Sequence, residues 1–182
     1  MTYFDHWIKE ELKVTYYYRY ADDIVLLSSN KDQLRSWFLA MKIYLTQVLD
    51  LHVKDNYQIY PVESRGIDFV GYVCYHNHTL LRKSIKLRLW KLVDTYCNKK
   101  ISKETYISRM ASYSGWLKYC DSKNLLKKIE EKTNFRYSGW NGIKTNISKF
   151  KGKWIYLVNI VPHRKYFVLQ FMYNKRAYEV RS

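Results

Sequence analysis

Hydrophobic positions in the first 81 residues follow two different periods. Apolar side chains at i, i+3 and i+4 predict amphipathic helices over residues 2–13 and 34–48. Runs of β-branched and aromatic residues predict five strands, over residues 14–20, 24–27, 52–62, 66–75 and 79–81. This region should therefore form antiparallel hairpins that pack against helices.

From residue 82 the helical period takes over and then gives way to a second strand-rich region. Apolar positions predict three helices within residues 82–131. A turn-rich stretch at 138–142 leads to three predicted strands, residues 154–160, 166–173 and 176–180. The pattern predicts an α+β chain in three parts, residues 1–81, 82–131 and 132–182.

Charge is distributed unevenly along the chain, whose net charge is +16. Residues 1–75 contain 8 Lys and Arg against 10 Asp and Glu, whereas residues 76–182 contain 24 against 6. A positive region of this size attracts polyanions and favours phosphate contacts. Aromatic residues make up 18% of the chain, and many lie between Lys and Arg, which adds flat surfaces for base stacking. The second half is therefore predicted to bind nucleic acid, with a solvated lysine surface as the alternative.

Asp22 and Asp23 lie where a hairpin turn would hold two carboxylates rigidly. Nucleotidyl transfer uses two Mg²⁺ ions about 3.5–4 Å apart, and Mg²⁺ prefers carboxylate and water oxygens. Asp is also common in β-turns. Taken alone, the pair therefore favours an ordinary acidic turn over a metal site.

The residues around these carboxylates change that assessment. Residues 18–27, Tyr-Arg-Tyr-Ala-Asp-Asp-Ile-Val-Leu-Leu, resemble the YxDD block of reverse transcriptases. Residues 66–72 and 80–83 look like the primer-grip hairpin of the bacterial members, the group II intron, retron and diversity-generating retroelement enzymes. The blocks are about 45 residues apart and occur in the family's order, and a basic helix follows. The resemblance covers roughly residues 1–130 and implies part of a polymerase palm and a helical thumb, whereas the β-rich tail of residues 132–182 is predicted from the strand pattern alone.

The resemblance also implies roles for single residues. Asp22 would bind the catalytic Mg²⁺, with Asp23 as its less direct partner. Tyr20 would lie beneath the template-primer. Gly71 and Tyr72 would lie against the primer backbone, where a missing side chain would let a phosphate approach closely.

Further basic residues complete the expected interface with nucleic acid. Arg82, Lys83, Lys86 and Lys91 flank the apolar stripe of the first basic helix, and the first three are expected to contact phosphate. Lys54 follows the second predicted helix, where related polymerases often carry a lysine near the leaving pyrophosphate. A solvent-exposed lysine at a strand end is the alternative for Lys54.

A complete palm of this family has a further metal-binding Asp on an earlier strand, and fingers that hold template and nucleotide. Upstream of the hairpin this chain has only Asp5, which is predicted to lie on a helix. The chain is therefore expected to be a truncated product, half of a split enzyme or an excised fragment that holds Mg²⁺ poorly. Its expected partners are an RNA template and a DNA primer, with dNTP bound only if an upstream polymerase half is supplied.

Two other classes of function compete with a polymerase fragment. One is a non-catalytic nucleic-acid-binding module, and the other is an unrelated basic protein with a chance Tyr-Ala-Asp-Asp sequence. Alternating Cys74, His76 and His78 would share a strand face and suggest Zn²⁺, but a fourth ligand is not apparent. The odd number of cysteines, the absence of a secretory signal and the shortness of every apolar run predict a cytoplasmic protein with reduced thiols and no membrane partner.

Overall fold

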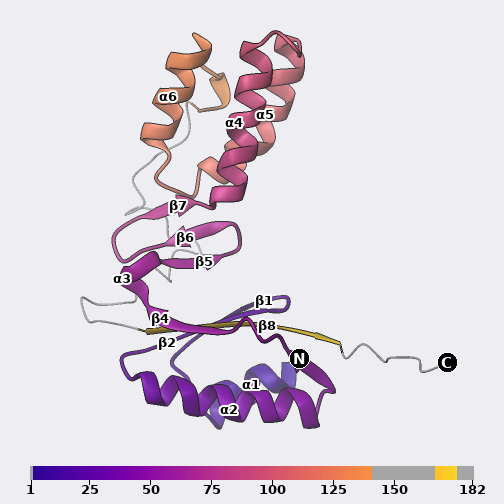
Figure 1. Cartoon of the computed structure of the whole chain (residues 1–182), viewed down its shortest axis with the longest axis vertical. Helices are drawn as coiled ribbons and strands as arrows, with labels where there is room; N and C mark the ends of the chain where they lie inside the picture. The colour runs from indigo at the N-terminus through magenta and orange to yellow at the C-terminus, as the bar shows by residue number, and fades with distance from the viewer. Residues whose placement is uncertain (1, 141–166, 176–182) are drawn as a thin grey trace, which may run out of the picture. The chain divides into compact units, whose positions relative to one another are not determined.

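A computed structural model describes residues 2–140 and 167–175 (Figure 1). In these residues the Tyr-Ala-Asp-Asp segment forms the predicted hairpin. Strand β1 (Tyr16–Tyr20) pairs antiparallel with β2 (Asp23–Ser28), and Tyr20 is opposite Asp23. Ala21 and Asp22 are left as a two-residue turn, in which Ala21 has a φ of 51°. Asp22 therefore lies in the turn itself, whereas Asp23 is the first residue of β2.

The two predicted N-terminal helices are present. Helix α1 (Thr2–Glu10) ends three residues earlier than the pattern predicts, ahead of Lys13 with its φ of 53°. Helix α2 (Lys31–Gln47) is capped by Asn30, whose side chain accepts hydrogen bonds from two backbone amides of the first turn. The cap explains why this helix begins directly after β2.

The strand predicted at 166–173 is observed as β8 (Phe167–Lys175), and it is the central strand of the sheet. One edge of β8, over residues 167–172, pairs with all of β2. The other edge pairs with β3 (Leu51–Val53) and β4 (Gln58–Pro61). β8 therefore joins the hairpin to the later strands. The strands predicted at 154–160 and 176–180 lie outside the described residues.

The chain divides into two compact units, and the division differs from the one expected at residues 81 and 131. Unit 1 contains the described residues up to Gly66 together with β8, and unit 2 contains the described residues from Ile67 to Trp140. The C-terminal strand belongs to unit 1 because its backbone is hydrogen-bonded on both edges there. The short helix α3 (Val62–Arg65) is the last element of unit 1 before the chain enters unit 2 at Ile67.

The core of unit 1 lies between one face of the sheet and the helices α1 and α2 (Figure 1). Side chains alternate along a strand, so every second residue of β2 and β8 faces these helices. The fully buried members of this core from the helices and from the two strands are Phe4, Ile8, Leu34, Met41, Leu45, Ile24, Leu26, Leu169 and Phe171.

Unit 2 combines a three-stranded meander with the predicted basic helices. The strands are β5 (Ile67–Phe69), β6 (Tyr72–Cys74) and β7 (Thr79–Leu81). The helices are α4 (Lys83–Cys97), α5 (Lys103–Leu117) and α6 (Lys123–Thr133), followed by a short 3₁₀ turn, η1 (Ser138–Trp140). Leu81 packs in the same core as the three helices, which places this meander with them. In the described part of the chain, no helix is long and apolar enough to cross a membrane.

Candidate functional site

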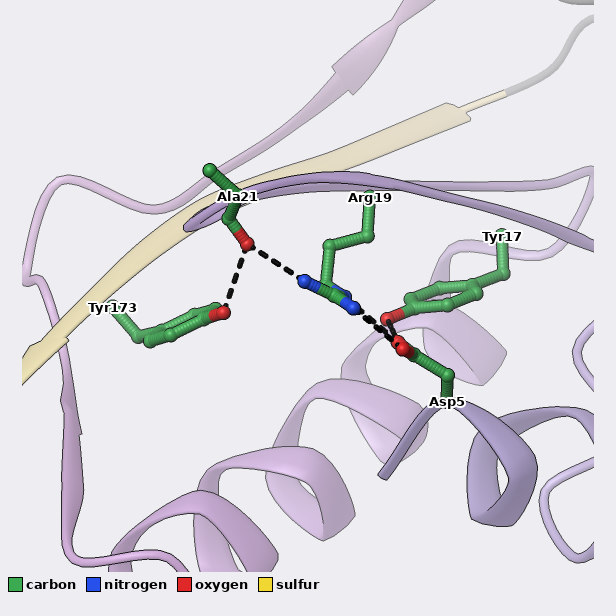
Figure 2. A network of polar contacts seen from close by, with 5 residues as sticks. All are labelled: Asp5, Tyr17, Arg19, Ala21 and Tyr173. Carbon is green, nitrogen blue, oxygen red and sulfur yellow. Dashed lines mark hydrogen bonds and ion pairs between the residues drawn. The ribbon is translucent and has the colours of Figure 1, made fainter. Parts of the chain in front are cut away.

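The backbone of the Ala21–Asp22 turn is held by side chains from two strands. The Tyr173 hydroxyl donates a hydrogen bond to the Ala21 carbonyl at 2.8 Å, and Arg19 Nη1 donates to the same oxygen at 3.0 Å (Figure 2). The Tyr173 backbone amide also donates to the Asp22 carbonyl at 3.3 Å. β8 therefore supports the turn through both its backbone and a side chain.

Arg19 is itself positioned by Asp5 of helix α1. The Asp5 carboxylate accepts hydrogen bonds from Arg19 Nη2 at 2.6 Å, from Arg19 Nε at 2.8 Å and from the Tyr17 hydroxyl at 2.6 Å (Figure 2). Burial raises the pKa of Asp5, but the Arg19 and Tyr17 hydrogen bonds and the Arg19 charge outweigh it and lower the pKa below its usual value. Asp5 thus stabilises β1 and, through Arg19, the hairpin turn. The alternation that places Tyr17 and Arg19 on one face of β1 is the sequence signal for this contact.

The Asp22 and Asp23 carboxylates contact different parts of unit 1. Asp22 Oδ2 lies 3.9 Å from Lys54 Nζ, and the Asp22 side chain is 46% exposed. Asp23 Oδ1 accepts a hydrogen bond from Gln170 Nε2 of β8 at 3.2 Å. The structure therefore brings Lys54 to the hairpin and adds Gln170, which the sequence pattern did not single out.

These contacts do not fit a preformed Mg²⁺ site. Mg²⁺ requires oxygen ligands in near-octahedral geometry, yet each carboxylate faces a nitrogen donor, Lys54 for Asp22 and Gln170 for Asp23. Among the described residues, no three His, Cys, Asp or Glu side chains are grouped where they could hold a metal ion. On the edge away from β1, β2 pairs with β8. The β8 sequence, Phe-Val-Leu-Gln-Phe-Met-Tyr-Asn-Lys, contains no carboxylate.

Tyr20 lies at the end of β1, directly before the hairpin turn. It is opposite Asp23, and 52% of its surface is exposed. Tyr16 and Tyr18 share its face of the strand, since side chains alternate, whereas Tyr17 points toward Asp5 on the helix-covered face. A partly exposed aromatic ring therefore lies next to the hairpin turn.

The tight turn between β5 and β6 consists of Val70 and Gly71, both with positive φ, at 48° and 83°. A Cβ atom at Gly71 would collide with ring carbons of Trp116 and lie 3.0 Å from Ile85 Cδ1. The missing side chain therefore makes room for an aromatic ring, where the sequence resemblance implied a phosphate. Tyr72 contacts the same residue, because its hydroxyl donates to the Trp116 carbonyl at 3.1 Å.

The three basic residues predicted at the start of α4 differ in their surroundings. Arg82 Nε donates to Asp68 Oδ1 at 2.5 Å, so its charge is partly compensated. Lys83 and Lys86 are exposed, and neither forms an ion pair within the described ranges. Lys83 and Lys86 are thus the better placed of the three to bind phosphate.

The cysteines of unit 2 are free thiols. Burial raises the pKa of Cys74 to about 11 and that of Cys120 to about 12, so both remain protonated at neutral pH. The His78 ring stacks on Tyr75 with 4.6 Å between centroids. The alternating Cys74, His76 and His78 are not among any metal-binding group in the part of the chain that the structure describes.

Comparison of the sequence with family models and with curated proteins gave no match.

Replacing Asp5 with asparagine should lower the free energy of unfolding by about 1–3 kcal/mol at pH 7, because Arg19 and Tyr17 would lose a charged acceptor. The folded pKa of Asp5 is lowered, so its contribution is present above the unfolded pKa of about 4 and is lost as pH falls through the folded pKa. Urea unfolding at pH 7 and at pH 3 measures both effects. A difference between wild type and Asp5→Asn that did not shrink at pH 3 would contradict the assignment.

Proposed function

We propose that this chain is the C-terminal palm-and-thumb portion of an RNA-directed DNA polymerase, and that by itself it binds nucleic acid without copying it. Unit 1 with the Tyr-Ala-Asp-Asp hairpin corresponds to the palm portion, and the helices of unit 2 correspond to the thumb. The observation that carries the proposal is the hairpin, which presents Tyr20, Asp22 and Asp23 at one turn of an antiparallel sheet.

The charge of unit 2 supports binding. Between residues 67 and 140 there are 15 Lys and Arg against 6 Asp and Glu. Asp68 and Asp94 are already paired with Arg82 and Lys132, and Glu130 with Arg136. Most cations of the helices are therefore available to phosphate, and their binding releases condensed counterions.

The surroundings of the carboxylates support the absence of copying by the chain alone. Lys54 and Gln170 direct nitrogen donors at Asp22 and Asp23, and β8 brings no third carboxylate to the hairpin. Nucleotidyl transfer with two metal ions needs carboxylate oxygens that face the ions. A further carboxylate from an upstream polymerase half would have to supply what these residues lack.

Binding is tested with a primer-template duplex and no added Mg²⁺. If about six cations contact phosphate, the slope of log K against log salt should be about −4 to −5. Lys83→Gln with Lys86→Gln should flatten the slope by up to about two, since both lysines are exposed on α4. Fluorescence anisotropy over a salt series measures it.

Asp22→Asn serves as the control, because this binding requires no metal and should not weaken. A salt-independent affinity, or no binding at low salt by a chain whose circular dichroism shows it folded, would overturn the proposal.

A further inference from the structure

A groove of about 570 Å³ runs between helices α4 and α5 of unit 2. Each helix contributes side chains at i, i+3, i+4 and i+7 spacing, so one face of each helix lines it. The lining residues are Ile85, Arg88, Lys91, Leu92, Thr95, Arg109, Ser112, Tyr113 and Trp116. The predicted binding residues Lys83 and Lys86 are not among them, so this is a different face of α4.

All charged side chains of the groove are positive. Arg88, Lys91 and Arg109 are exposed, and no carboxylate lines the groove with them. Among the described residues, none of the three takes part in an ion pair. The nearest acidic residue along α4, Asp94, is held by Lys132 at 2.6 Å. The groove therefore has uncompensated positive charge that favours an anionic ligand.

The aromatic part of the groove is held in place from behind. Trp116 is 37% exposed, and its ring lies over Gly71, whose missing Cβ leaves the space for it. The centroids of the Tyr72 and Trp116 rings are 5.5 Å apart, and the Tyr72 hydroxyl donates a hydrogen bond to the Trp116 carbonyl. A partly exposed indole fixed in this way is a surface on which a flat apolar group can stack.

We propose that the groove between α4 and α5 binds single-stranded nucleic acid, with an unpaired base against Trp116 and the flanking phosphates against the three cations. A stacking surface inside a cationic groove distinguishes this ligand from a duplex, whose base faces are covered by their neighbours. The inference deepens the proposed function, on which it rests, by assigning a second contact surface with its own ligand. Gly71 and Tyr72 act here as positioning residues for Trp116.

The full chain is tested against a short fluorescein-labelled oligothymidylate and a duplex of the same length. Trp116→Leu should weaken single-strand binding about tenfold and leave duplex binding unchanged, because stacking is available only to unpaired bases. Tyr119→Leu, which removes an exposed aromatic outside the groove, is the control and should change neither affinity.

Charge is tested separately, in case Trp116→Leu disturbs packing around Gly71. Arg88→Gln with Arg109→Gln should flatten the single-strand salt slope by about 1.4, or about 0.7 for each lost contact. The control pair, Lys123→Gln with Lys128→Gln, removes two exposed charges on α6 and should flatten the single-strand salt slope less.

The outcomes separate this inference from the proposed function. If the groove pair weakens single-strand binding no more than the α6 pair does, the groove is not the site, although the Lys83 and Lys86 result for the duplex still stands. Unchanged single-strand affinity in a folded Trp116→Leu variant would likewise overturn the inference. Failure of the wild-type chain to bind either probe would remove both proposals.

Discussion

Replacing Leu169 with alanine should lower the free energy of unfolding of unit 1 by about 2–5 kcal/mol, the range for deleting a fully buried leucine side chain. Leu169 is 0% exposed and lies on β8 between Leu26 of β2 and Ile59 of β4. Removing the Leu169 side chain would leave a cavity among the core residues of β2, β4 and α2. The expected result follows from β8 being central in the sheet.

The measurement is urea unfolding, together with hydrogen exchange of the β1 and β2 amides by mass spectrometry, which isolates unit 1. Leu39→Ala is the matched control, because Leu39 is 60% exposed on α2 and the same atoms are removed. Exchange in β2 should accelerate only in Leu169→Ala. Equal behaviour of the two variants would mean that residues 167–175 do not complete the sheet.

Replacing Gly71 with alanine should lower the free energy of unfolding by about 2–5 kcal/mol. A left-handed backbone costs a residue with a Cβ about 1–2 kcal/mol, and forcing extra atoms into a packed site typically costs about 1–3 kcal/mol. Both apply here, since Gly71 has a φ of 83° and its Cβ would collide with Trp116. Thermal and urea unfolding measure the loss, and the tryptophan emission of the folded variant reports a displaced ring.

Two companion variants isolate the cause. Gly115 lies in α5 with no atom near its Cβ position, so Gly115→Ala should stabilise the chain by about 0.5–1 kcal/mol. Val70 has a φ of 48°, which a β-branched residue adopts with strain. Val70→Asn suits the turn better and should not destabilise it. A neutral Gly71→Ala would mean that neither the turn nor the Trp116 contact is as described.

Both predictions bear on function. β8 supplies Tyr173 and Gln170 to the hairpin, so a loosened β8 should weaken the Gln170 hydrogen bond to Asp23 and the Tyr173 hydrogen bond to the Ala21 carbonyl. Gly71 determines where Trp116 lies, and with it the stacking surface of the α4–α5 groove. The hairpin and the groove therefore each depend on a residue that need not touch a ligand.

Local pattern was enough to predict much of this protein. The hairpin around Asp22 and Asp23, helix α2 and the three basic helices follow from hydrophobic period, cap residues and turn residues, all of which act within a few positions along the chain. The lysines at 83 and 86 were correctly predicted to be exposed, because they flank an apolar stripe. Net charge and aromatic content also require no tertiary information.

Contacts between distant segments decided the rest. Strand pairing depends on which edges are free after the whole chain folds, so the pattern that predicted a strand near 166–173 could not place it between β2 and β4. For the same reason the sequence could not show that Gln170, 147 positions away, binds Asp23. The groove joins faces of two helices, and Trp116 meets Gly71 across 45 residues. Sequence alone thus determined the local elements and their charge, whereas tertiary packing determined which side chains face the carboxylates and which aromatic ring lines the groove.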